Sequence, residues 1–197
     1  NTVYLQDASE IKKSSTNTKE ETPTHGYQQS PIIISDEQSY FIRGSTKEEL
    51  CEEVYKWQKN QEDEDMIANI RYNLIDNYYT VFTDSGWTIG NFTVTAKSLI
   101  TVPQWESSGG ASDNTKEDWR RFKNAVYSHE REHRDILIDY ANRLVNEYNN
   151  LGYYSSDTIL RSEIQSTYDS IYNQMRDTQS KFDDVHGKSE SFSELCY

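Results

Sequence analysis

The fold class follows from one stretch of the chain, Phe92-Thr93-Val94-Thr95-Ala96-Lys97-Ser98-Leu99-Ile100-Thr101-Val102. Its even-numbered positions are mostly apolar, and its odd-numbered positions are mostly Thr or Lys. A period of two predicts a β-strand with one buried face and one wetter face. Pro103 follows directly, and we expect it to end the strand.

Two amphipathic helices are predicted on the C-terminal side of this strand. Residues 116–148 carry a stripe at steps of three and four, formed by Trp119, Phe122, Val126, His129, His133, Ile136, Tyr140, Leu144 and Tyr148. Residues 158–180 carry a second stripe, formed by Leu160, Ile164, Tyr168, Ile171 and Met175. We expect the residues from Phe182 to Gly187 to form a tail after this helix.

Shorter elements are predicted on the N-terminal side. Residues 40–43 read as a strand ended by Gly44, and Ser45 with Glu48 forms a capping box for a short helix. Two extended runs follow over 70–74 and 79–81, with a turn at 84–86. Strands followed by long helices predict an α+β domain, with a small, mostly antiparallel sheet packed against two long helices.

Length and composition limit the domain organisation. The chain has 197 residues, which suits one domain, and we place it at residues 31–197. Residues 1–30 are almost entirely polar and show no hydrophobic period, so we expect a flexible tether. The residues Cys51 and Cys196 could pair in an oxidising compartment or remain thiols in a reducing one, and sequence separation does not decide between these states.

The charge balance excludes several classes of protein. With 33 acidic and 20 basic residues the formal net charge is -13, which argues against a nucleic-acid partner. No apolar run is long enough for a transmembrane segment. The chain opens with polar residues and without Met, so no signal peptide is visible, and earlier removal of an export signal is compatible with this.

The residues His129-Glu130-Arg131-Glu132-His133 form an H-E-x-x-H motif inside the predicted helix 116–148. A spacing of four puts both imidazoles on one face of a helix, where two ring nitrogens can bind one Zn²⁺. The carboxylate of Glu130, about 100° further round the helix, can then take a proton from a water on the metal. The motif thus predicts a zinc site suited to peptide hydrolysis.

The alternative for this motif is a solvated, salt-bridged helix face without metal. The phase of the helix speaks against it, because both histidines fall on the apolar stripe while Arg131 and Arg134 do not. Two imidazoles buried side by side need a partner or a metal.

A third protein ligand is required, and the residues alone leave three candidates for it. An extended form of the motif, H-E-x-x-H-x-x-G-x-x-H, ends in a third ligand, and Asp139 occupies that last position. However, Ile136 stands where this pattern has the Gly that turns the backbone away from the helix. Glu163, on the predicted helix 158–180, could be the third ligand, because other zincins bind zinc through a glutamate that follows the motif in the sequence. His186 is the remaining strong ligand type, and Gly187 lets the backbone bend beside it.

Several stretches resemble the bacterial domain-of-unknown-function 922 family, which is regarded as secreted zinc-dependent proteases and grouped with the zincin-like metallopeptidases. The stretches are Tyr40-Phe41-Ile42-Arg43-Gly44-Ser45-Thr46 with Glu49-Leu50, Ile100-Thr101-Val102-Pro103-Gln104-Trp105, Trp119 and Phe122 with the motif, and Phe182-Asp183 followed by His186-Gly187. The resemblance covers about residues 40–187. It implies a zincin-like fold, in which an edge strand beside the metal aligns an extended substrate. The strand from Phe92 to Val102 is the candidate for that edge, and the alternative is that it is an ordinary core strand.

From the motif and the resemblance we expect a zinc metallopeptidase acting on a peptide or protein substrate. His129, His133 and His186 would bind Zn²⁺, and Glu130 would be the general base. The protein would be exported, and would be periplasmic, secreted or membrane-tethered at the bacterial envelope. The alternatives are an envelope binding or adhesion module with a structural or vestigial zinc site, and a metal-free interaction domain with packed histidines.

Overall fold

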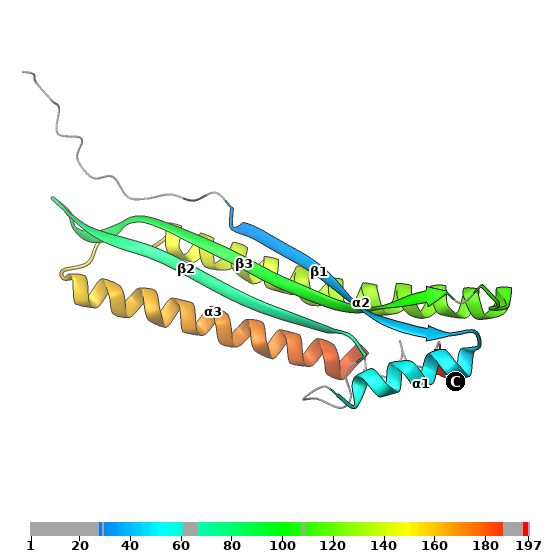
Figure 1. Cartoon of the computed structure of the whole chain (residues 1–197). Helices are drawn as coiled ribbons and strands as arrows, with labels where there is room; N and C mark the ends of the chain where they lie inside the picture. Colours follow the sequence, from blue (N-terminus) through cyan, green and yellow to red (C-terminus); the bar gives the residue numbers. More distant parts are fainter. Residues whose placement is uncertain (1–27, 29, 61–66, 108, 187–194, 197) are drawn as a thin grey trace, which may run out of the picture.

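The order of elements agrees with the predicted α+β class. The computed structural model describes residues 28, 30–60, 67–107, 109–186 and 195–196. Its elements are β1 (Ile32–Gly44), α1 (Lys47–Gln58), β2 (Asn69–Thr83), β3 (Gly86–Ser107), α2 (Asp113–Asn149) and α3 (Asp157–His186) (Figure 1). The two extended runs predicted over 70–81 belong to the single strand β2. No helix in the described part of the chain is long and apolar enough to cross a membrane.

The three strands form one sheet in the order β1-β3-β2. β2 and β3 are an antiparallel hairpin, but β1 pairs with β3 in parallel, so the prediction of a mostly antiparallel sheet is wrong for β1. The strand also does not end at Pro103, because β1 stays paired with β3 as far as Gly44 opposite Ser107. The pairing of β2 reaches only to Thr101 of β3. Pro103, which lacks an N–H, therefore lies where β3 has one neighbour left.

One face of the sheet is buried under the long helices, as the alternation in β3 predicts. Figure 1 shows α2 and α3 running along the length of the sheet. The first core joins the sheet to both helices through Leu74, Ile89, Phe92, Val94, Ala96, Leu137, Ala141, Leu144, Val145, Tyr148, Leu160, Ile164, Ile171 and Met175.

A second core lies at the other end of the sheet, where α1 and the first half of α2 pack. Its buried members are Ile42, Leu50, Val54, Ile67, Ala68, Ile100, Val102, Trp119, Phe122, Val126 and Leu195. Along α2, the second core ends at Val126 and the first begins at Leu137. The buried residues of α2 between these two positions are Glu130 and His133. We call this polar zone between the two cores the seam.

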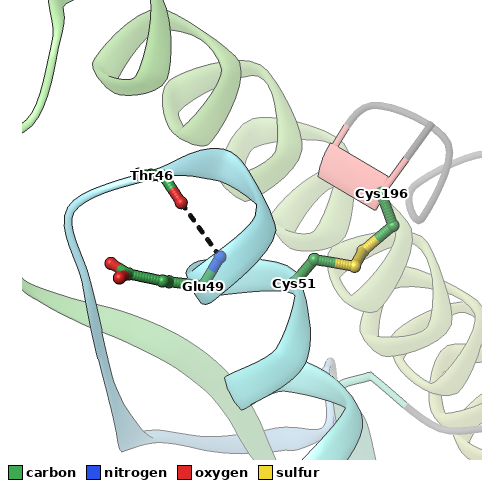
Figure 2. The surroundings of a disulfide bond; sticks show 4 residues. All are labelled: Thr46, Glu49, Cys51 and Cys196. Atoms are coloured by element: carbon green, nitrogen blue, oxygen red, sulfur yellow. Dashed lines mark hydrogen bonds between the residues drawn. A yellow bond between two sulfur atoms is a disulfide. The ribbon is translucent and has the colours of Figure 1, made fainter.

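The helix α1 begins one residue later than predicted and is linked covalently to the C-terminal segment. Its N-cap is Thr46 rather than Ser45, and the Thr46 hydroxyl accepts a hydrogen bond from the backbone N–H of Glu49 (Figure 2). Cys51 of α1 forms a disulfide with Cys196, with 5.5 Å between the Cα atoms. The pairing that the sequence left open is thus present, and it fixes Leu195 in the second core.

Candidate metal centre

The two histidines of the motif face one another on an uninterrupted helix. α2 is capped at Ser112 and continues without a break to Asn149. The ring centroids of His129 and His133 are 4.8 Å apart, and their Nε2 atoms are 3.1 Å apart. The helix therefore presents two ring nitrogens to the same point in space.

The carboxylate of Asp183, on α3, completes this cluster. Its Oδ1 lies 2.8 Å from Nε2 of His133 and 3.3 Å from Nε2 of His129. Tetrahedral Zn²⁺, with bonds of about 2.0–2.1 Å to nitrogen or oxygen, would set its ligand atoms about 3.3–3.4 Å apart. The separations of 3.3 and 3.1 Å are close to that spacing, and the separation of 2.8 Å is about half an ångström shorter. His129, His133 and Asp183 are a group that could hold a metal ion, and two imidazoles with one carboxylate suit zinc.

Two further residues of α3 hold the imidazole rings in place. The ring of Phe182 packs against both histidines, with centroids 4.9 Å from each. The amide of Gln179 bonds to His133 twice, to Nδ1 of the ring and to the backbone carbonyl. One stretch of α3 thus supplies a candidate ligand, an aromatic contact and a hydrogen-bonding amide to the same pair of rings.

Glu130 is the most deeply buried carboxylate of the motif. It is 6% exposed and occupies the buried face of α2, whereas the neighbouring His129 is only partly buried. Burial raises the pKa of Glu130 to about 8, and the negative charge of Asp183 adds to the rise. The Asp183 carboxylate is thus close enough for its charge to act on the proton of Glu130. An acid with a pKa close to neutrality can both accept and return a proton near pH 7.

The cluster is buried on one side and open on the other. The side chain of His133 is 7% exposed, that of His129 is 18% exposed, and that of Asp183 is 40% exposed. Solvent can therefore reach the cluster past Asp183, whereas His133 and the neighbouring Glu130 lie on its buried side. A catalytic zinc site needs such an open position for water and substrate.

The sheet beneath the cluster is polar at the same level. Ser98 of β3 is 2% exposed and lies between Ala96 of the first core and Ile100 of the second. Its partner on β2 is Tyr72. Burial raises the pKa of Tyr72, and the charge of Asp183 is among the smaller causes. The structure thus brings Tyr72, one of the 15 tyrosines of the chain, near the cluster.

Of the three third ligands predicted from the sequence, two lie away from the cluster and the side chain of the third is not described. Asp139 and Glu163 are both exposed and lie outside the cluster. Glu163 precedes Asp183 by twenty residues on the same helix, which is about 30 Å along its axis. His186 is the last residue of α3, and its side chain lies outside what the structure describes, so its role as a ligand stays a prediction.

The site includes three residues of α3 that were not predicted from the sequence, namely Gln179, Phe182 and Asp183. We expected a tail from Phe182 onwards, but α3 continues to His186 and carries Gln179 and Asp183 on one face. The available signal was the spacing of four between these two residues, with Phe182 beside the second. It can be recognised only if the helix is extended past residue 180.

The predicted substrate-aligning edge is wrong for the strand from Phe92 to Val102. β3 is the central strand of the sheet, and from Thr95 to Thr101 it pairs with β1 on one side and with β2 on the other. The backbone groups of these residues are already used in those pairings, so an extended peptide cannot add along them. The edges of the sheet are β1 and β2.

Comparisons with known proteins give one match. The sequence model of a family described as "Bacterial protein of unknown function (DUF922)" matches residues 37–190. This range contains every residue of the cluster. No curated protein and no solved structure matches the chain.

Proposed function

Because this chain belongs to the DUF922 family of bacterial proteins of unknown function, its chemistry is inferred from the site, and we propose that it is a zinc-dependent metallopeptidase. His129, His133 and Asp183 would hold the zinc ion. Glu130 would act as the general base. His186 stays an alternative or additional ligand.

The observation that carries this proposal is the convergence of three ligand atoms from two helices at the seam. Two imidazole nitrogens and a carboxylate oxygen lie 2.8–3.3 Å apart, although each of them can carry a lone pair towards the others. Such an arrangement is favourable only with a proton or a cation between the atoms. Three protein ligands with one side open to solvent are the usual pattern of a catalytic zinc site.

A bound zinc ion would supply Lewis acidity, polarising a carbonyl group and lowering the pKa of a water ligand to about 7. The chain's own contribution is the carboxylate of Glu130, which would accept a proton from the attacking water as the oxygen of this water bonds to the peptide carbonyl carbon. Glu130 would then give this proton to the leaving nitrogen, so that the carboxylate is restored when the C–N bond breaks.

The substrate class and the compartment belong to the same proposal. Peptides or proteins fit the reaction, and the net charge of -13 disfavours a nucleic-acid substrate. The disulfide between Cys51 and Cys196 supports an exported protein in the periplasm, outside the cell or tethered at the envelope. Disulfides persist in such oxidising compartments and are rare in the reducing cytosol.

A second candidate function is favoured by the position of the cluster between the two cores. A zinc ion there would join α2 to α3 and could act only as a structural crosslink in an envelope binding module. A structural site is closed by a fourth protein ligand, whereas a catalytic site keeps water there. His186, three residues after Asp183, is the candidate for such a fourth ligand.

The test combines metal analysis with one substitution. Purified protein is loaded with Zn²⁺, dialysed and analysed by mass spectrometry for zinc per chain. It is then assayed on unfolded casein and on a fluorogenic peptide library, beside Glu130→Gln. The proposal predicts one zinc per chain in both proteins, with hydrolysis by the wild type alone. Zinc without hydrolysis by either protein would favour the structural crosslink, and absence of zinc would reject both functions.

A further inference from the structure

The buried amide of Gln179 needs an explanation that packing does not provide. Gln179 lies on α3 and is 3% exposed, although glutamine is seldom fully buried. Burying an amide is unfavourable unless its polar atoms are hydrogen-bonded. Both ends of this amide are bonded, and both bonds go to one residue, His133.

The backbone of α2 fixes which end of the amide faces the ring. The Nε2 group of Gln179 donates to the carbonyl oxygen of His133 at 2.9 Å. If the amide were turned over, its oxygen would face that carbonyl oxygen, and two acceptors would meet without a proton. The oxygen Oε1 must therefore face Nδ1 of the ring, and Nδ1 must carry the proton that it donates.

A proton held on Nδ1 has a consequence at the other ring nitrogen. In the neutral imidazole with a proton on Nδ1, the lone pair is on Nε2. That is the atom facing Oδ1 of Asp183 at 2.8 Å and Nε2 of His129 at 3.1 Å. Gln179 and Asp183 are four residues apart on α3, so one face of this helix contacts both nitrogens of the same imidazole.

We propose that Gln179 is a positioning residue for the metal centre: it holds the proton on Nδ1 of His133 and the ring in place, so that Nε2 is free to bind a divalent cation. This inference rests on the proposed function for the identity of the cation. A hydrogen-bond acceptor on the ring nitrogen that faces away from the metal fixes the tautomer and the orientation of a metal-binding histidine. Because the amide is neutral, it does this without adding a further charge beside Glu130 and Asp183.

The test compares Gln179→Met with Gln174→Met. Methionine has a similar size, so a residue that only fills space should tolerate it. Gln174 lies on the same helix, is exposed, and bonds to Arg143 and Ser170 instead of the cluster. Zinc affinity is measured by competition with a chromophoric chelator. We expect Gln179→Met to weaken zinc binding about 10–100-fold and Gln174→Met to leave it unchanged. Equal affinities in the two variants would overturn the proposal.

A second measurement uses the wild-type protein and does not depend on the folding of a variant. Long-range ¹H–¹⁵N spectra of the wild type, with its resonances assigned sequentially, report which nitrogen of His133 carries a proton. We expect a protonated Nδ1 in both metal-free and zinc-loaded protein, and no proton on Nε2 when zinc is bound. An Nδ1 without a proton in either state would contradict the role assigned to Gln179.

The two readouts keep this inference separate from the proposed function. If the protein binds zinc but hydrolyses no peptide, the metallopeptidase proposal fails, and the effect of Gln179→Met on zinc affinity still stands. If the protein binds no zinc, the proposed function fails together with the metal-positioning role. In that case a proton on Nδ1 of His133 would show only that Gln179 orients the ring.

Discussion

Oδ1 of Asp183 lies 2.8 Å from Nε2 of His133, although 50 positions separate the two residues in the chain. The contact exists because α2 and α3 pack side by side and because α3 continues past the position where its apolar stripe stops. Gln179 contacts the other nitrogen of the same ring. The candidate metal centre is therefore a property of the helix pair, and the H-E-x-x-H motif supplies only part of it.

Replacing Asp183 tests whether its carboxylate is the third ligand. Asp183→Asn keeps the size of the side chain but removes its negative charge, so we expect zinc affinity to fall at least about tenfold. Asp184→Asn is the matched control, because the same change is made at an exposed neighbouring position. Isothermal titration with Zn²⁺ measures both. Equal affinity in the two variants would show that Asp183 is not a ligand, and His186→Asn would then be the next variant to measure.

Glu130→Gln separates catalysis from metal binding. The amide is nearly isosteric with the carboxylate but cannot accept the proton, and general acid–base catalysis contributes about 10²–10⁴-fold to rates. We expect turnover of a fluorogenic peptide to fall by that factor while zinc content is retained. Glu132→Gln, on the exposed face of the same helix turn, should leave turnover unchanged. Full activity in Glu130→Gln would remove the proposed base.

The stability of the metal-free protein should depend on the protonation of Glu130. Its folded-state pKa is raised from 4.5 to about 8, so between these values the folded protein holds a proton that the unfolded chain releases. Stability from this group is therefore complete below about pH 4.5 and is lost as the pH rises through about 8. The slope is at most about 1.4 kcal/mol per pH unit.

Urea unfolding of metal-free wild type and Glu130→Gln at several pH values measures this effect. The free energy of unfolding of the wild type should decrease, relative to that of the variant, as the pH rises from about 5 to about 8. Parallel pH profiles for the two proteins would mean that the carboxylate keeps an ordinary pKa.

The disulfide between Cys51 and Cys196 should contribute substantially to stability. It closes a loop with a sequence separation of 145 residues and anchors Leu195 in the second core. Replacing both cysteines with serine should lower the free energy of unfolding by about 2–5 kcal/mol. Urea unfolding with and without a reducing agent measures this. The reductant should destabilise the wild type and have no effect on the double variant, and a wild type indifferent to reductant would contradict the prediction.

Much of the fold could be predicted because its periodicities are local. The alternation around Val94 and the helical stripe from Trp119 onwards identified the central strand and the long helix. The parallel pairing of β1 and the extension of β3 past Pro103 could not be predicted, because both depend on a strand some sixty positions away in the sequence. The disulfide depended on a distance between Cys51 and Cys196 that no local pattern contains.

The candidate site was predictable only where its residues lie on one helix. His129, Glu130 and His133 are neighbours through the period of α2, so the sequence was enough to group them. Gln179 and Asp183 join them through the packing of α3 on α2. Polar residues near the end of an amphipathic helix resemble an exposed tail when the burial of their face is not known.

Zinc K-edge X-ray absorption of the zinc-loaded protein reports the atoms bound to the metal, and so it shows whether His129, His133 and Asp183 form a zinc site. We expect one tightly held zinc with four light-atom ligands at about 2.0–2.2 Å, at least two of them imidazoles and one a carboxylate. A protein that loses its zinc on dialysis, or a zinc bound by fewer than two imidazoles, would contradict the proposed centre.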